Sequence, residues 1–554
     1  MSILNKNIFQ IFQETCSAYP DKTCIRFKKG NVYESFTYAQ LCEKVLRLRH
    51  VLLRLGIKPG ERIAILLGNG PEWPLAFFAI VSTQAVAVPI DIQLAPEDIK
   101  GILIHSASRF LLTEERFGIS LSEILSGEVS TKALFLERLD WSANRSQEQF
   151  LKERSFFTWD KLAALFYTSG TTQEHKAVML THKNLLSNFS SVQKTKIFTK
   201  DEVVLSLLPL HHTYPFMMTC LAPLLMGATV CYLPSMVHHE LFSSIKENKV
   251  TFFVGVPQLF SLIERSICDE LKKSGLLFRW TIDRLLDISS GLSVLTGQNI
   301  SKLILRKLHN TFGDHLKFMA SGGAKLDPDV ARSFYRWGFK IIEGYGLTET
   351  SPIVTFNPAD PAKFDSVGNP VPGVEVNIMK AGEEGSGEIA VRGDNVMLGY
   401  YRAPSLTKSV FLGRWFLTGD LGFQDKEGYL YITGRINELI VLPSGKKINP
   451  EKIEAHYLKS PFIKEVCVLY AKSGVEGGHL VAVVVPDEEE LRAKRHFNIN
   501  FKLRWELDNA SQQMPSYQRV KGFVLSKEAL PRTRLGKVVR FKIEEKYKAG
   551  GFTQ

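Results

Sequence analysis

The strongest candidate for chemistry is a loop that follows an apolar strand in LAALFYTSGTTQEHKAVMLTH, residues 162–182. Hydroxyl groups and one glycine gather there in Thr168, Ser169, Gly170, Thr171 and Thr172, and Lys176 follows. Such a loop can bind a polyphosphate, because backbone amides and hydroxyls donate to phosphate oxygens and a lysine offsets their charge. It lacks the spacing of a Walker loop. Taken alone, the segment fits a Ser/Thr-rich turn equally well.

A second segment, IIEGYGLTETSPIV at residues 341–354, places four candidate groups after a strand: Tyr345, Gly346, Thr348 and Glu349. An aromatic face, a hydroxyl and a carboxylate suit a nucleobase, a phosphate oxygen and Mg²⁺ respectively. Upstream, the SGGA segment offers bare backbone for close approach of a ligand at Gly322, Gly323 and Ala324. A hairpin turn with an exposed acid is the competing interpretation.

Three weaker segments lie nearer the C-terminus: WFLTGDLG with Asp420, YITGRINELI with Arg435 and Glu438, and LPRTRLGKVVR with Lys537. A carboxylate after a glycine-containing turn can accept both hydroxyls of a ribose. A lysine in a basic loop flanked by glycine is a mobile positive charge. Each of these segments alone also fits a solvated surface.

The elements around these segments predict an α/β fold. Short apolar runs alternate with helical patterns, which is typical of sheets covered by helices on both faces. The predicted strands lie within residues 61–69, 85–90, 109–115, 203–210, 249–257 and 316–324. One helix has clear ends, with Asp327 as its N-cap, Pro328 at its first position and Gly338 just beyond it. After Gly434, shorter units predict a small α+β domain.

Length and composition narrow the class of protein. A chain of 554 residues exceeds one hydrophobic core, and 45% hydrophobic with 23% charged residues excludes a disordered chain. Seven cysteines without a CxxC pair suggest neither a disulfide framework nor zinc, so we expect a reducing cytoplasm. The uncharged stretch 213–237 is long enough to span a bilayer, but Pro215, Pro223 and Gly227 interrupt it. We therefore expect a buried helix followed by a core strand.

Net charge is +12, and more than half of it comes from residues 436–554, where 21 Lys/Arg face 14 Asp/Glu. A positive net charge is compatible with nucleic acid, an anionic membrane surface, an acidic protein or a polyphosphate as binding partner. It does not distinguish between these partners.

In their order and separation, the segments resemble the adenylate-forming superfamily of acyl-CoA synthetases, adenylation domains and luciferases. The resemblance covers essentially the whole chain. It implies a large N-terminal adenylation domain, residues 1–435, and a small mobile C-terminal lid, residues 436–554. It also implies two steps: a carboxylate attacks the α-phosphate of ATP to give an acyl-adenylate and pyrophosphate, and a thiol then displaces AMP.

The resemblance also implies roles for the candidate residues. The loop Thr168–Thr172 and Lys176 would hold the phosphates, Tyr345 and the SGGA backbone would sandwich adenine, and Thr348 would meet the α-phosphate. Glu349 would bind Mg²⁺, and Asp420 and Arg435 would bind the ribose. Lys537 would bridge the carboxylate and the α-phosphate. His212, in LPLHHTYPF, matches the position beside the reacting carboxylate, although a buried structural histidine is the alternative. Glu438 would be the hinge, and Ser444, Gly445 and Lys446 would line the thiol tunnel.

The phosphate loop departs from the common form YTSGTTGxPKG at three positions, Gln173, His175 and Ala177. A catalytically degenerate acyl- or nucleotide-binding protein therefore stays an alternative, although the charged candidates are all present.

The apolar helical stretch between Val254 and Phe318 resembles the insert of long-chain fatty acyl-CoA synthetases, and a fatty chain needs such a tunnel. We expect a long-chain fatty acid as substrate, with CoA and acyl carrier protein nearly level as thiol acceptors. Nucleic acid is not expected as a partner, and peripheral contact with the inner membrane face stays open.

Overall fold

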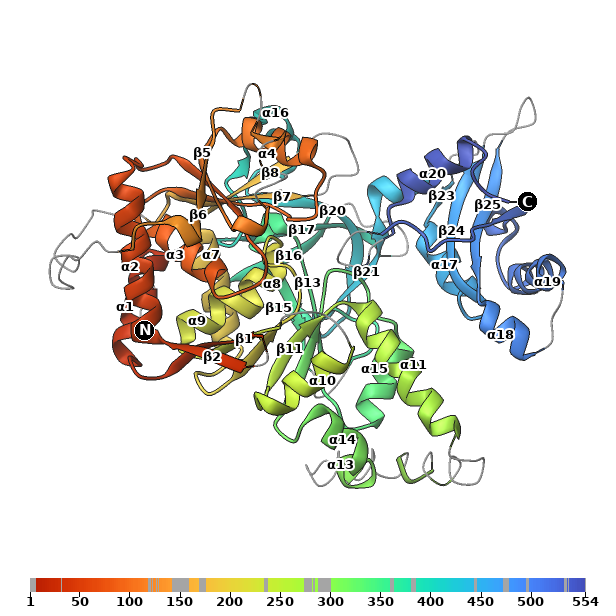
Figure 1. Cartoon of the computed structure of the whole chain (residues 1–554). Coiled ribbons are helices and arrows are strands. Elements are labelled where there is room, and N and C mark those ends of the chain that lie inside the picture. The colour runs from red at the N-terminus through yellow and green to blue at the C-terminus, as the bar shows by residue number, and fades with distance from the viewer. Residues whose placement is uncertain are drawn as a thin grey trace. The chain divides into compact units, whose positions relative to one another are not determined.

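The computed structural model describes residues 6–30, 32–117, 121, 123–125, 127, 129–141, 159–168, 176–233, 238–273, 281, 284–286, 300–358, 363–379, 385–442, 446–471, 478–494, 498–532, 536 and 538–553. The chain forms two compact units, one of Met1–Val376 with Val391–Phe416 and one of Asn377–Ala390 with Leu417–Gln554. Figure 1 shows the helices and strands that make up the two units. The expected domain boundary between residues 435 and 436, and the hinge expected at Glu438, stay predictions, because a division into compact units does not locate a moving joint.

A nine-stranded sheet dominates the first unit. Its strands, in spatial order, are β15 (Asn369–Pro370), β14 (Ile353–Asn357), β13 (Ile341–Gly346), β12 (Phe318–Ser321), β11 (Phe252–Gly255), β9 (Val203–Ser206), β10 (Thr229–Tyr232), β1 (Thr23–Lys29) and β2 (Val32–Thr37). The strands from β13 to β1 are parallel, and antiparallel pairs occur only toward the two edges. Parallel strands are buried on both faces, which explains the continuous apolar runs in the sequence.

A seven-stranded sheet in the same unit has a similar plan. Its order is β18 (Gly399–Tyr400), β8 (Lys176–Thr181), β7 (Leu162–Thr168), β4 (Val86–Pro89), β3 (Arg62–Leu66), β5 (Ser108–Thr113) and β6 (Lys132–Phe135). Parallel pairs join β7 to β6, whereas β7, β8 and β18 are antiparallel. All six predicted strand regions therefore contain a strand, which confirms that part of the prediction.

Helices cover these sheets. Those of the first unit are α1 (Ile8–Ala18), α2 (Tyr38–Arg54), α3 (Glu72–Ser82), α4 (Pro96–Ser106), α7 (His182–Lys194), α8 (Thr213–Phe216), the π-helix η3 (Met217–Leu221), α9 (Ala222–Met226), α10 (His238–Glu247), α11 (Pro257–Lys273), α13 (Ile300–Ile304), α14 (Arg306–Phe312), α15 (Pro328–Arg336) and α16 (Pro404–Ser409). Helix α15 begins after Asp327, whose side chain accepts from the Asp329 amide, and ends before Gly338, as predicted.

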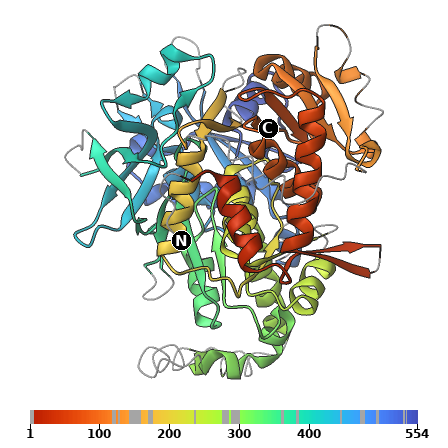
Figure 2. The same cartoon turned by 90° about the vertical axis from the view of Figure 1, so that its left-hand side faces the viewer.

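The helices α3, α7 and α9 form a layer between the two sheets (Figure 1). Helix α3 contacts β3 and β4, η3 contacts β9 and β11, and α7 contacts both η3 and α9. Aromatic rings fill this layer, where Phe216 lies 4.7 Å from Phe77 and 5.5 Å from Phe166 between ring centroids. In Figure 2 the red helices α1 and α2 lie in front of this layer, and they contact one another.

The uncharged stretch from Thr213 onward runs through α8, η3 and α9 into β10, and nearly all of it is buried. This confirms the expectation of a buried helix followed by a core strand. None of the described helices combines the length and the apolar character needed to cross a membrane.

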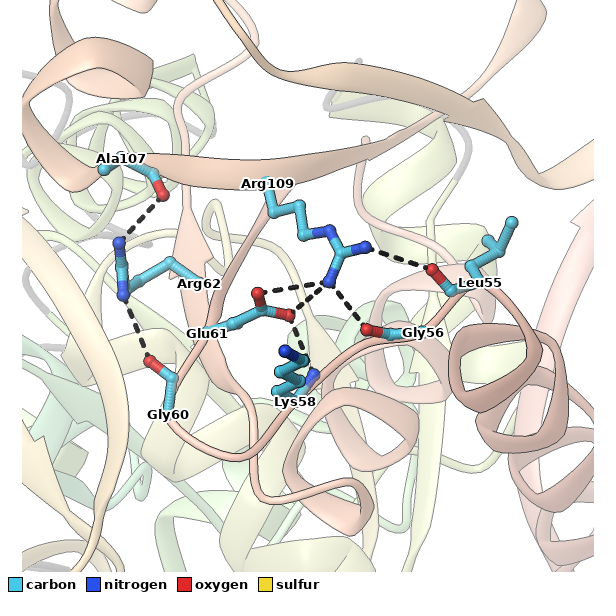
Figure 3. A network of polar contacts seen from close by, with 8 residues as sticks. All are labelled: Leu55, Gly56, Lys58, Gly60, Glu61, Arg62, Ala107 and Arg109. Atoms are coloured by element: carbon cyan, nitrogen blue, oxygen red, sulfur yellow. Dashed lines mark hydrogen bonds and ion pairs between the residues drawn. The ribbon is translucent and has the colours of Figure 1, made fainter.

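Two arginines fasten the loops at the amino ends of β3 and β5 (Figure 3). Arg62 donates to the carbonyls of Gly60 and Ala107 at 3.2 and 3.0 Å. Arg109 donates to Glu61 at 2.8 Å and to the Gly56 carbonyl at 2.6 Å. These bonds tie the turn after α2 and the residue that ends α4 to the first residues of β3 and β5, so they fix the amino edge of the sheet.

A five-stranded sheet, in the order β16 (Val374–Met379), β17 (Gly387–Gly393), β20 (Trp415–Gln424) and β19 (Phe411–Leu412), has β21 (Leu430–Arg435) paired with β20. The chain passes from one unit to the other within β16, β17 and β20.

The remainder of the second unit is α+β, as predicted. It contains the pair β22 (Ile440–Val441) and β23 (Lys447–Ile448), the sheet β24 (Ile463–Ala471), β25 (His479–Pro486) and β26 (Gly522–Leu525), and the helices α17 (Pro450–Tyr457), α18 (Glu488–Ala493), α19 (Ile499–Gln512) and α20 (Arg540–Lys548). Arg540 on α20 pairs with Glu454 on α17 at 2.6 Å, which joins the two helices across β24.

Stability of the first unit should depend on the protonation of His182. This buried side chain accepts a hydrogen bond from the Ile8 amide through Nδ1 at 3.4 Å, and burial lowers its pKa from 6.5 to about 4. Because this histidine must stay neutral in the folded state, its contribution to stability is fully present above pH 6.5. The contribution is lost as the pH falls toward 4, and the free energy of unfolding falls by about 3 kcal/mol in total. Chemical denaturation should show a shallower pH dependence for His182→Asn than for the wild type.

The matched control is His315→Asn, which removes an exposed histidine. It should leave the pH dependence of the wild type unchanged. Identical slopes for His182→Asn and the wild type between pH 6.5 and 4.5 would contradict the assignment.

Candidate functional site

Three of the predicted segments meet at one edge of the nine-stranded sheet. Strands β9, β12 and β13 are parallel members of that sheet, and each is followed directly by candidate residues. The histidines follow β9, Gly322 follows β12, and Thr348 follows β13. Crevices outside the carboxyl ends of parallel strands are where ligands bind in open α/β sheets. The topology therefore brings these segments together although more than 100 residues separate the first of them from the other two in sequence.

A hydroxyl pair joins the first of these segments to the last. Thr213 Oγ1 donates to Thr348 Oγ1 at 3.2 Å. The neighbouring His212 begins α8, and its ring lies 4.2 Å from that of His211, centroid to centroid. His211 Nε2 lies 3.4 Å from the carboxylate of Asp91, which the sequence analysis did not single out. The structure thus places Thr213, the residue after His212, in contact with Thr348, while the roles of His212 and Thr348 stay predictions.

Glycine is required at two positions of the site by close approach. A Cβ at Gly322 would lie 2.7 Å from the ring of Tyr214, and one at Gly346 would lie 1.8 Å from the carbonyl oxygen of Pro352. Gly323 and Ala324 are exposed and leave their backbone open to a ligand. Tyr345, the predicted adenine contact, is 9% exposed. The arrangement fits a flat ligand that approaches bare backbone, as predicted for adenine.

Glu343 was missed by sequence reasoning. Glu343 precedes Tyr345 by two positions on β13. Since side chains two positions apart in a strand share a face, both extend from the same side of β13. Burial raises its pKa to about 8. A carboxyl group that is partly protonated at neutral pH can donate as well as accept a hydrogen bond, which suits contact with the edge of a base.

The turn with Glu349 is held by a distant loop. Tyr400 donates its hydroxyl to Glu349 Oε1 at 2.8 Å, and the Met397 amide donates to the Glu349 carbonyl at 2.8 Å. Asn395 Nδ2 donates to the Thr350 carbonyl at 2.9 Å. Burial raises the pKa of the Tyr400 hydroxyl, and the nearby Glu349 carboxylate adds to this. Tyr400 is therefore a donor that orients the carboxylate, and no local sequence pattern indicates this role.

Glu349 fits the chemistry of a magnesium ligand. Mg²⁺ in phosphate sites is held by one or two carboxylates together with phosphate oxygens and water. Within the described part of the chain, no group of three or more His, Cys, Asp or Glu side chains could form a complete protein cage for a metal. A single oriented carboxylate suits a metal ion whose other ligands would be phosphate oxygens of the substrate.

The phosphate loop is described only at its ends. Thr168 ends β7 and Lys176 begins β8, and the two residues face each other in the antiparallel register. Thr168 Oγ1 contacts the Lys176 carbonyl at 3.5 Å. Ser169, Gly170, Thr171 and Thr172 lie outside the described residues, as do Gln173 and His175. The phosphate role of this loop stays a prediction.

In the second unit, Asp420 and Arg435 form a pair. They face each other on β20 and β21, and Arg435 Nε lies 2.8 Å from Asp420 Oδ1. Asp420 is 2% exposed, whereas the arginine is largely exposed. Both residues were predicted to bind ribose; the geometry adds that Arg435 holds the carboxylate of Asp420 in place.

The remaining candidates also belong to this unit. Glu438, the predicted hinge, lies in the short helix η5 (Ile436–Glu438) directly after β21. Lys446 is exposed between β22 and β23, with its Nζ 4.4 Å from the ring centroid of Tyr517. Lys537, Ser444 and Gly445 lie outside the described residues. Their roles stay predictions.

Comparison with known families gives two matches. Residues 12–401 match the family described as AMP-binding enzyme, and residues 437–550 match the AMP-binding enzyme C-terminal domain. Together the two matches cover most of the chain, in the order that the motifs predicted.

Individual relatives are distant but extend over most of the chain. A long-chain-fatty-acid–CoA ligase of Mycobacterium bovis is 28% identical over 473 residues, 81% of this chain and 78% of that protein. A feruloyl-CoA synthase of Amycolatopsis is 28% identical over 461 residues, 82% of this chain and 84% of that protein. The crystal structure of ATP-bound MatB from Rhodopseudomonas palustris has a TM-score of 0.76 at 25% identity and covers 98% of this chain and 99% of its own. The predicted fold class is confirmed.

Removal of the Tyr400 hydroxyl should weaken binding of magnesium and ATP. Tyr400→Phe keeps the ring but leaves Glu349 without one charge-assisted hydrogen bond, so calorimetry should show ATP binding about 10-fold weaker at limiting Mg²⁺. The difference should shrink as Mg²⁺ is raised. Tyr401→Phe, one residue along the chain, is the control and should bind as the wild type does. Equal affinities of Tyr400→Phe and the wild type at all Mg²⁺ concentrations would refute the role.

Proposed function

The chain belongs to the AMP-binding enzyme family, the adenylate-forming superfamily that its motifs resemble, and on this premise we propose that it is an ATP-dependent acid–thiol ligase for long-chain fatty acids. It activates the acid as an acyl-adenylate and transfers the acyl group to the thiol of CoA or of acyl carrier protein. The observation that carries the proposal is the meeting of His212, Thr213, Gly322 and Thr348 at one sheet edge of the first unit.

Two steps are needed because a carboxylate has no leaving group. In the first, a carboxylate oxygen bonds to the α-phosphorus of ATP and pyrophosphate leaves. In the second, the thiol sulfur bonds to the acyl carbon, AMP leaves and the thiol gives up its proton. The hydroxyl of Thr348 would contact the α-phosphate, and Glu349, oriented by Tyr400, would hold Mg²⁺, which offsets phosphate charge when bound. Exclusion of water protects the mixed anhydride between the steps.

A long-chain acid is favoured by two observations. The stretch between Val254 and Phe318 is long and rich in Leu, Ile and Phe, and a fatty chain gains about 0.8 kcal/mol per methylene removed from water. Several relatives, including the Mycobacterium bovis protein, are named as long-chain ligases. The feruloyl-CoA synthase makes an aromatic acid the competing substrate class.

The acceptor is CoA or acyl carrier protein. The names of the relatives favour CoA. The excess of 21 Lys/Arg over 14 Asp/Glu in residues 436–554 suits either an anionic nucleotide thiol or an acidic carrier surface. A reducing cytoplasm, with peripheral contact at the inner membrane face, stays a prediction.

The proposal is tested by supplying purified protein with ATP, Mg²⁺ and either palmitate or ferulate, with CoA or holo acyl carrier protein as the sole thiol. Acid-dependent AMP and thioester should form at least 10-fold faster with palmitate. Faster product from ferulate would overturn the acid class, and the preferred thiol names the acceptor. If no acid gives AMP, the alternative of a degenerate acyl- or nucleotide-binding protein is favoured, as the substitutions at Gln173, His175 and Ala177 allow.

The role assigned to Lys537 gives a sharper prediction. Lys537→Ala should slow adenylation by a factor on the order of 10² to 10³, the scale of one lost electrostatic contact in a transition state. Thioester formation from supplied acyl-adenylate should be spared, because the lysine is needed only in the first step. Lys527→Ala removes an exposed lysine of the same unit and serves as the control. Equal losses in both half-reactions would exclude the assignment.

A further inference from the structure

Tyr214 stands out among the residues at the carboxyl edge of the nine-stranded sheet. It follows the histidine pair by two residues and belongs to α8, next to Thr213. A Cβ placed at Gly322 would lie 2.7 Å from Cζ and 3.0 Å from the hydroxyl oxygen of Tyr214. The phenol therefore lies against the backbone of Gly322, where the segment after β9 contacts the segment after β12.

The hydroxyl of Tyr214 is in an unusual state. Its oxygen is inaccessible to water and has no hydrogen-bond partner among the described residues, although the side chain as a whole is partly exposed. The Oγ of Ser321, the residue before Gly322, is likewise buried without a partner. A buried hydroxyl without a partner lowers stability, so most such groups in proteins are paired. Tyr214 lies against Gly322 and Ser321 directly precedes that glycine, so both hydroxyls belong to segments at the carboxyl edge of the sheet, where a ligand can supply the missing partner.

We propose that the Tyr214 hydroxyl donates a hydrogen bond to a carboxylate oxygen of the acid substrate and so positions that group next to Thr348. The inference rests on the proposed function, because it names a residue that binds the acid of that reaction. It adds a substrate contact for which neither the motifs nor the comparisons gave a role.

The neighbours of Tyr214 favour a carboxylate over other ligand groups. Thr213 is tied to Thr348 by the 3.2 Å hydroxyl pair, so the next side chain along α8 starts from a fixed position beside the expected α-phosphate contact. His212, two residues before Tyr214, is the residue expected beside the reacting carboxylate. Burial raises the pKa of Tyr214, so the phenol keeps its proton and acts as a donor, which a carboxylate oxygen needs.

An apolar role is the competing explanation. In that case the ring of Tyr214 would only form a wall against the acyl chain, and a phenylalanine would serve as well. The two explanations differ in a single atom, which makes Tyr214→Phe the decisive variant. Because the hydroxyl has no partner among the described residues, its removal should not lower the thermal midpoint and is not expected to disturb folding.

The experiment measures acid-dependent AMP formation by the wild type and Tyr214→Phe at varied palmitate and at varied ATP. We expect kcat/KM for palmitate to fall about 10-fold, the scale of one lost buried hydrogen bond, with KM for ATP unchanged and the thermal midpoint equal or higher. Tyr470→Phe removes another buried hydroxyl that lacks a described partner, on β24, and is the matched control. It should leave kcat/KM for palmitate unchanged.

Each remaining outcome decides the matter. If the wild type is active and Tyr214→Phe stays within about twofold of its kcat/KM for palmitate, the hydroxyl contact is refuted while the proposed function stands. If KM for ATP rises as much as KM for palmitate, the residue acts on the nucleotide and the inference is also refuted. A wild type without acid-dependent AMP refutes the proposed function, and the contact with it.

Discussion

The parallel register of β9, β11, β12 and β13 is the constraint on which the rest of the site depends. Parallel pairing places the carboxyl ends of all these strands at one edge of the sheet. The segments that follow the strands, including the one with Thr348, therefore lie at that edge. The sheet needs helices on both faces to be buried, and the layer of α3, α7 and α9 meets that need against the seven-stranded sheet. The candidate residues can therefore sit on short loops, because the strands beneath them are fixed by the core.

A second level of organisation orients the side chains that the sheet only delivers. The turn with Glu349 is bound through its backbone by Met397 and through its carboxylate by Tyr400. In the second unit, Arg435 does the same for Asp420. In both cases a carboxylate that is expected to contact substrate or metal is held by a second side chain, that of Tyr400 or Arg435. Such support limits the orientations that must be lost when a ligand binds.

Much of the fold could be predicted because its signals are local. Short apolar runs between helical patterns indicated the strands, and Asp327 and Gly338 marked the two ends of α15. The contacts that shape the site are not local: Tyr400 meets Glu349 across 51 residues, and Tyr214 meets Gly322 across about 100. No pattern of residue types at fixed spacing encodes such a pair, since only the strand order brings its members together. The π-helical turn η3 was equally unpredictable, because its backbone is set by packing.

The pairing of β1 with β10 has a consequence for synthesis of the chain. Ile25 lies opposite Val230 in a parallel register, so the first strand waits for a partner that leaves the ribosome about 200 residues later. At the usual rate of translation this delay is about 10 to 40 s. Throughout that time α1 and β1 can contact α2, α3 and β2, but they lack β10, α9 and the Leu225 carbonyl to which Thr15 donates. The packing of the first strand is thus completed only after β10 has been made, and the apolar surface that stays exposed until then is what a chaperone would meet first.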